Sequence, residues 1–187
     1  MKTLILAAAL LALAAPAWAQ NAADQTKNGQ PPKAPSATTQ TFVKNAAITD
    51  MFEIQAGQLA QQKADDAAYK DFAQMTIDDH TKTTNEIKSM NLGVQPPQEL
   101  DAAHKAKFDK LSGLSGAAFE RQFKNEQVQG HKQAIKEFET YAKRGDNQEL
   151  RGWAEQTLPA LKTHLQHAEA LPSPRPAKTS GINTKNR

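Results

Sequence analysis

The chain has 187 residues, of which 23 are Lys or Arg, 20 are Asp or Glu and none is Cys. This length suits one domain of ordinary size, and the lack of Cys excludes disulfides, thiolate metal sites and Cys nucleophiles. The net charge of +3 does not indicate a nucleic-acid surface, because the basic excess gathers at the C-terminal end, where Arg175, Lys178, Lys185 and Arg187 stand without an acid.

The N-terminal residues have the pattern of a secretory signal peptide. Lys2 is followed by an apolar run, Leu4–Ala15, and then by an A-x-A cleavage pattern that ends at Ala19. The run is shorter than the ~20 apolar residues that a membrane-spanning helix needs. We therefore predict a signal peptide over residues 1–19, no transmembrane segment in the mature protein, and a periplasmic location in a bacterium. Because no Cys follows the signal, a lipid anchor on an N-terminal Cys is excluded.

The rest of the chain is dominated by apolar residues at steps of three and four, which predict amphipathic helices. Residues 20–40 are rich in Asn, Gln, Pro, Ser and Thr and predict a flexible linker. Long helices are expected at residues 41–64, 65–90, 115–144 and 147–170, and a short helix at 100–111. Thr41 is the expected N-cap of the first helix, and residues 171–187 are expected to form a disordered basic tail.

The links between these helices predict the topology of an all-α fold. No alternating strand pattern is present. Short links make the first and second long helices antiparallel, and likewise the third and fourth, whereas the long link lets the third helix run parallel to the second. This is a ferritin-like four-helix bundle over residues 41–170, with one long crossover that carries the short extra helix. The small residues Ala56, Gly57 and Ala60 predict a close approach between the first helix and a neighbour.

Ionisable residues lie on or beside the apolar stripes of all four long helices. Glu53 is central in the first stripe, His80 lies on the second, His131 is central in the third and His164 lies at the edge of the fourth. One inward ionisable group per helix at mid-height is how bundle metal sites are built. We therefore predict these four residues as candidate metal ligands, with Asp79 assisting. If the helices start level, His164 lies one or two turns, up to ~8 Å, from the layer of the others.

The spacing limits which metal site can be built. A di-iron carboxylate site needs Glu-x-x-His on two helices. The residues three positions before His80, His131 and His164 are Ile77, Val128 and Leu161. A di-iron oxidase is thus the least supported hypothesis, and a mononuclear His/carboxylate site for a divalent transition metal such as zinc, copper or iron remains.

A metal-free hydrogen-bonded network is the alternative. Buried polar groups normally pair with one another. Glu53 could pair with His131, and Asp79 with a neighbouring backbone group. The sequence favours this network over a metal site without deciding between them.

The remaining polar residues indicate no catalytic machinery. His104, on the short helix, is expected to be solvated, and His167 is expected on the polar side of the last helix. No nucleophile triad, phosphate loop or pair of catalytic carboxylates is recognisable. The sequence therefore predicts no catalytic residue and favours a non-enzymatic protein.

Several motifs together resemble a known family. They are FAQMTIDDHTK at Phe72–Lys82, GAAF at Gly116–Phe119, Gln127 with His131, and Leu158-Pro159 with His164. The pattern is similar to the domain-of-unknown-function 4142 family of exported bacterial proteins, which are often labelled as outer-membrane proteins. The resemblance covers about residues 41–170 and implies a ferritin-like bundle, but no established activity. Glu120 stands where that family usually has Asp, a departure that we do not expect to disturb the fold.

Three functional hypotheses follow from these features. The first is a non-enzymatic periplasmic bundle with a role in the envelope or stress response, which binds an envelope protein or a second copy of itself. The second is a metal-binding bundle protein that uses the inward residues. The third is an oxidase-like di-iron enzyme, which the spacing disfavours.

Overall fold

The computed structural model describes residues 34–174, and most of these residues are helical. The predicted signal peptide, most of the predicted linker and most of the predicted basic tail lie outside the described residues. The helices are α2 (Ala37–Lys63), α3 (Ala67–Ser89), α4 (Ala102–Ser112), α5 (Gly116–Arg144) and α6 (Gln148–Ala170). No strand occurs between residues 34 and 174, so the all-α prediction is confirmed.

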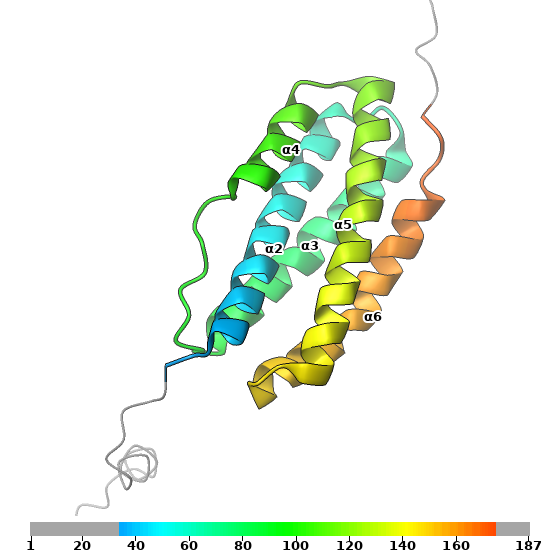
Figure 1. The fold of residues 1–187 in the computed structure, drawn as a ribbon. Helices are drawn as coiled ribbons and strands as arrows, with labels where there is room; N and C mark the ends of the chain where they lie inside the picture. The colour runs from blue at the N-terminus through cyan, green and yellow to red at the C-terminus, as the bar shows by residue number, and fades with distance from the viewer. Residues whose placement is uncertain (1–33, 175–187) are drawn as a thin grey trace, which may run out of the picture. The chain divides into compact units, whose positions relative to one another are not determined.

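The four long helices form the bundle that the link lengths predict (Figure 1). α2 packs mainly against α3, and α5 mainly against α6, each as an antiparallel pair. The segment between α3 and α5 crosses the length of the bundle, so these two helices run in the same direction. α4 lies on this crossover and packs against α2 and α5. Within residues 34–174 no helix has the length and apolar character needed to span a membrane.

Four helix starts are fixed by side-chain caps. The carboxylates of Asp66 and Asp101 and the side-chain oxygen of Asn147 each accept a backbone N–H from the first turn of α3, α4 and α6. In α2 the cap is Ser36, whose Oγ accepts the backbone N–H of Thr39 at 3.1 Å. The expected cap at Thr41 and the expected linker end at residue 40 are therefore wrong.

The early start of α2 has a tertiary cause. Thr39 is buried, and its hydroxyl lies 2.7 Å from the Tyr141 hydroxyl and donates to Asp146 Oδ1 at 2.8 Å. Residues 38 and 39 are β-branched threonines, which favour helix only weakly. The contacts with the end of α5 supply the stabilisation that the local sequence lacks.

The core consists of two apolar clusters separated by a polar layer. One cluster includes Tyr69, Phe72, Leu111, Phe119 and Phe123. The other includes Phe42, Phe138, Tyr141, Trp153 and Leu161. Between them, in the middle of the long helices, the buried polar residues are Asp50, Glu53, Thr76, His80, Gln127, His131 and His164. The fold therefore places five buried ionisable groups at one level of the bundle, namely Asp50, Glu53, His80, His131 and His164, whereas the buried Glu120 lies near the start of α5.

Replacement of the observed cap should be more harmful than replacement of the expected one. We expect Ser36→Ala to lower the free energy of unfolding by about 1 kcal/mol, because it leaves the Thr39 N–H without its acceptor. Thr41→Ala is the matched control and should not destabilise, since Thr41 is exposed inside the helix. Chemical denaturation followed by circular dichroism measures both. Equal losses in the two variants would place the helix start elsewhere.

Candidate metal centre

Three buried histidines from three helices meet in the polar layer. His80 on α3, His131 on α5 and His164 on α6 are each no more than 3% exposed. Their ring centroids lie 5.3 to 5.8 Å apart. One ring nitrogen of each lies within 4.8 Å of the others. The protonation of each ring follows from the partner of its other nitrogen.

His80 is held from the side of α2. Its Nδ1 lies 2.8 Å from Asp50 Oδ1, and an ionised carboxylate only accepts hydrogen bonds, so Nδ1 carries the proton. Asp50 is itself fixed, because its Oδ2 accepts from the hydroxyls of Thr83 and Thr84 at 2.9 and 3.1 Å. The Nε2 of His80 is buried without a hydrogen-bond partner.

His131 is held by its own helix. Its Nδ1 lies 2.8 Å from the backbone oxygen of Gln127, one turn earlier. Because a carbonyl only accepts, Nδ1 is the protonated nitrogen and Nε2 of the neutral ring carries a lone pair. This lone pair points at His164, whose Nδ1 lies 3.3 Å away.

His164 is held from the side of α3. Its Nε2 lies 2.8 Å from Asp79 Oδ2, so Nε2 donates and Nδ1 of the neutral ring carries a lone pair. Two lone pairs, on His131 Nε2 and His164 Nδ1, therefore face each other at 3.3 Å. This contact is repulsive unless a proton or a metal ion lies between the two nitrogens.

The pKa values of His131 and His164 argue against a proton between their facing nitrogens. Burial lowers the pKa of His131 to about 4, with a further contribution from the neighbouring His80. Burial also lowers the pKa of His164 to about 4, although the Asp79 hydrogen bond opposes the shift. For His80, burial is outweighed by the hydrogen bond and charge of Asp50, and the pKa is raised. His131 and His164 are therefore neutral at neutral pH.

α2 adds a carboxylate beside the three rings. Glu53 is 1% exposed, and its Oε2 has no hydrogen-bond partner. Burial raises the pKa of Glu53, while the nearby His80 and Gln127 side chains lower it. The side-chain amide of Gln127 is also buried and unpaired at both its nitrogen and its oxygen. Since buried polar atoms normally have partners, the layer has the donor set for a bound cation.

The structure brings most of the predicted ligands together. The three histidines form one cluster, and Asp79 binds His164 from outside in the assisting position predicted for it. Glu53 lies in the same layer, but its carboxylate is not within 4.8 Å of all three rings. The expected pairing of Glu53 with His131 is not formed, since His131 bonds Gln127 and His164.

The expectations for His164 and His104 are wrong. The predicted displacement of His164 is wrong: His131 and His164 lie at similar distances from the turn that joins α5 to α6, so antiparallel packing brings them level. His104 is half-buried rather than solvated, because it pairs with Asp101 at 2.8 Å and contacts the Phe52 ring. His167 is exposed, as expected.

Asp50, the partner of His80, is a site residue that was not predicted from the sequence. Asp50 is buried, at 5% exposed. It follows Ala46 by four residues and precedes Gly57 by seven, so it shares the buried face of α2 with Glu53. A stricter reading of the helical period at this point would have found it.

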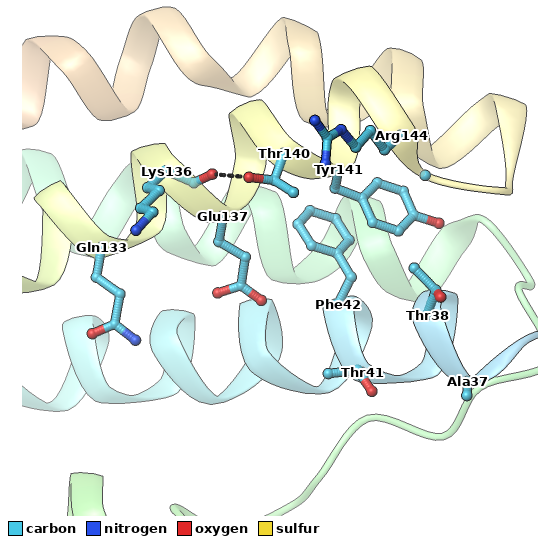
Figure 2. Close-up of a pocket in the computed structure, with 11 residues that line it drawn as sticks. Ala37, Thr38, Thr41, Phe42, Gln133, Lys136, Glu137, Thr140, Tyr141 and Arg144 are labelled. Atoms are coloured by element: carbon cyan, nitrogen blue, oxygen red, sulfur yellow. Dashed lines mark hydrogen bonds between the residues drawn. The ribbon is translucent and has the colours of Figure 1, made fainter.

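A surface groove lies apart from this cluster. It lies between the start of α2 and the end of α5, with a volume of about 630 Å³. Figure 2 shows Phe42 and Tyr141 stacked in its wall, with Glu137, Lys136 and Arg144 along α5. Its charged residues are one acid, Glu137, and two bases, Lys136 and Arg144, so the groove offers no comparable ligand set.

The fold and this cluster define a class: a ferritin-like four-helix bundle with three histidines at its centre. The chain belongs to the family described as a domain of unknown function (DUF4142), whose sequence model matches residues 23–171. The predicted family is thereby confirmed. The chain is also similar in structure to a DUF305 fragment from Deinococcus radiodurans, known from a crystal structure.

That structural similarity shows the fold alone. The TM-score is 0.64 at 14% sequence identity, and the match covers 73% of this chain and 95% of the fragment. No curated protein matches this chain.

The depressed histidine pKa values predict how the metal-free fold responds to acid. Between pH 6.5 and about 4 the unfolded chain protonates His131 and His164, whereas the folded chain does not. The free energy of unfolding should therefore fall as the pH drops through this window. His80 has the opposite sign: its raised pKa stabilises the fold below 6.5, and this contribution is lost only as the pH rises through its folded pKa.

Denaturation in chelator-treated buffer across this pH range measures the effect. Carboxylates titrate in part of the same window, so the informative quantity is the difference between the natural chain and His131→Gln. The variant should lose less stability on acidification, because one excluded proton is gone. Parallel pH profiles for the two proteins would contradict the assignment.

Proposed function

We propose that this protein is a periplasmic, non-enzymatic bundle protein that binds one divalent transition metal ion through His80, His131 and His164. The observation that carries the proposal is the pair of lone pairs that face each other at 3.3 Å. In a tetrahedral site with metal–nitrogen bonds of about 2.0–2.1 Å, neighbouring ligand nitrogens are separated by about 3.3 Å. The spacing of His131 Nε2 and His164 Nδ1 thus suits a shared metal ion.

The partners of the rings support the same proposal. Metal-binding histidines usually donate their other ring N–H to a carboxylate or a backbone carbonyl, which fixes the tautomer and orients the lone pair. Here Asp50, the Gln127 carbonyl and Asp79 supply those acceptors, one to each ring. All three rings are thus oriented by the contacts that a metal site requires.

The donor set limits the metal. Three neutral imidazoles suit zinc, copper, nickel or iron, and disfavour the hard cations calcium and magnesium. A divalent ion would also offset the charges of Asp50, Glu53 and Asp79, which surround the rings. A di-iron site would need several bridging carboxylates. Beside these rings Asp50 and Asp79 already accept hydrogen bonds from His80 and His164, which leaves Glu53.

The cellular part of the proposal rests on the N-terminal pattern. A signal peptide that ends at Ala19 would deliver the protein to the periplasm. A role in the envelope or stress response, with an envelope protein or a second copy as partner, is compatible with metal binding. Fractionation of cells that express the full chain, with mass measurement of the mature N-terminus, tests this part separately.

Metal binding should require the three clustered histidines and should not depend on His104 or His167. We expect tag-free mature protein to bind one Zn²⁺ or Co²⁺ per chain, and His131→Ala to bind neither at the same free-metal concentration. Zn²⁺ should raise the free energy of unfolding by about 2.7 kcal/mol at a free concentration one hundred times Kd. Elemental analysis, the Co²⁺ absorption spectrum and denaturation measure these effects.

Two histidine variants serve as controls. His104→Ala and His167→Ala remove imidazoles outside the cluster and should leave the stoichiometry unchanged. Substoichiometric metal in the natural chain, unaltered by His131→Ala, would refute the metal proposal and favour the hydrogen-bonded network.

The groups that accept hydrogen bonds from the outer ring nitrogens should change the affinity for the metal but not the number of ions bound. We expect Asp79→Asn to weaken Zn²⁺ binding by about 10- to 100-fold, because His164 loses its charged acceptor. Asp78→Asn is the matched control: it changes the neighbouring carboxylate, which is exposed and bonds only Gln74. Competition with a chromophoric chelator gives both affinities. The same affinity in both variants would mean that Asp79 does not support a ligand.

A further inference from the structure

A second cavity leads from the surface toward the polar layer. It has a volume of about 280 Å³ and lies where α2 and α5 are overlaid by the start of α4. We name it the α2–α4–α5 cleft. Gln133 and Glu137 line both this cleft and the groove of Figure 2, so the two are neighbours along the α2–α5 seam. The cleft thus lies next to open surface at one end.

Glu53 marks the inner end of the cleft. It lines the cavity although it is almost completely buried, and its Oε2 has no hydrogen-bond partner. Its charge also interacts with His80 and His164. The Glu53 carboxylate therefore lies between the cleft and the three histidines.

Gly130 keeps the space beside this carboxylate open. It lines the cleft one residue before His131, and a Cβ at this position would lie 3.4 Å from Glu53 Oε1. Glycine inside a helix costs about 1 kcal/mol relative to alanine. A larger side chain here would extend over Glu53 and into the cavity.

The lining of the cleft favours cations. Its carboxylates are Glu53, Asp101, Glu126 and Glu137. The opposing charge is Lys107, which is paired with Glu126 at 3.3 Å. A cavity lined by one sign of charge raises the local concentration of the opposite ion. A hydrated divalent cation is the ligand class that this lining suits.

Another cavity also approaches the three histidines, but the carboxylate at its inner end is already hydrogen-bonded. It lies between α3 and α6, has a volume of about 270 Å³, and is lined by Asp79 and Thr157. The Asp79 carboxylate already accepts from the outer nitrogen of His164. This cavity therefore meets the back of a ligand ring, whereas the cleft meets a free carboxylate oxygen.

We propose that the α2–α4–α5 cleft is the path by which a divalent cation reaches the three histidines, and that Glu53 is the carboxylate that receives the ion in the cleft and, by turning toward the rings, completes its coordination. This inference rests on the proposed metal-binding function. It adds a fourth ligand and a direction of access, both of which can fail while metal binding itself holds.

The test compares the rate of metal uptake with the amount bound. Metal-free protein is mixed with Co²⁺ in a stopped-flow instrument, and the absorption of the bound ion is followed. We expect Gly130→Met to slow uptake by about tenfold or more, because uptake then requires movement of the blocking side chain. Stoichiometry at equilibrium should remain that of the natural chain.

Two further variants distinguish blockage of the cleft from a general disturbance of the fold. Ala103→Phe, from the exposed face of α4, should also slow uptake, since it narrows the cleft without approaching Glu53. Ala160→Met, in the α3–α6 cavity, is the matched control and should not. Circular dichroism verifies that each variant is folded.

The role of Glu53 as a ligand is tested by the Co²⁺ absorption spectrum. Glu53→Gln keeps the volume and removes the charge, so it should slow uptake, weaken affinity and change the Co²⁺ spectrum while the three histidines still bind. An unchanged spectrum would overturn the ligand assignment.

The remaining outcomes distinguish failure of the proposed path from failure of the proposed function. Natural uptake rates in both cleft variants, or slow uptake in Ala160→Met alone, would overturn the path and leave metal binding intact. A natural chain that binds no Co²⁺ at all would instead overturn the proposed function.

Discussion

The burial of three imidazoles at one level of a helical bundle is the constraint on which the rest of this structure depends. A buried ring must satisfy both nitrogens or lose the hydrogen bonds that water supplied. Here the outer nitrogen of each ring is satisfied by Asp50, the Gln127 carbonyl or Asp79. Two of these acceptors belong to a helix other than the ring's own. The contacts therefore fix the relative heights of α2, α3 and α6, and they leave the inner nitrogens facing one another.

The close packing of α2 against α3 makes this arrangement possible. Gly57 lies so near α3 that a Cβ would approach Ile77 Cγ1 to 2.8 Å, and the neighbouring Ala56 and Ala60 are fully buried. The helices thus approach closely two turns beyond Asp50, which allows its short side chain to reach His80. The small residues, which carry no chemistry, set the distance over which the carboxylate acts.

Helical periodicity was enough to predict the helices, their topology and the inward residues Glu53, His80, His131 and His164, because each depends on local spacing along one helix. The start of α2 was not predictable, since Thr39 is held by Tyr141 and Asp146 from the far end of the chain. Asp50 differs from Thr39, because its spacing from Ala46 and Gly57 already places it on the buried face of α2, but its partner His80 lies on another helix. The partner of each ring nitrogen likewise depends on tertiary contacts.

The choice between a metal site and a hydrogen-bonded network turns on the two nitrogens of His131 and His164. A proton placed between them would make His164 cationic at neutral pH, about three units above its pKa of about 4, at a cost of roughly 4 kcal/mol. Moving the proton of neutral His164 to Nδ1 would instead turn the lone pair of Nε2 toward the Asp79 carboxylate. A divalent ion relieves the contact without either cost, and its charge is balanced by Asp50, Glu53 and Asp79 around the rings. The electrostatics of the layer therefore favour a metal ion over a shared proton.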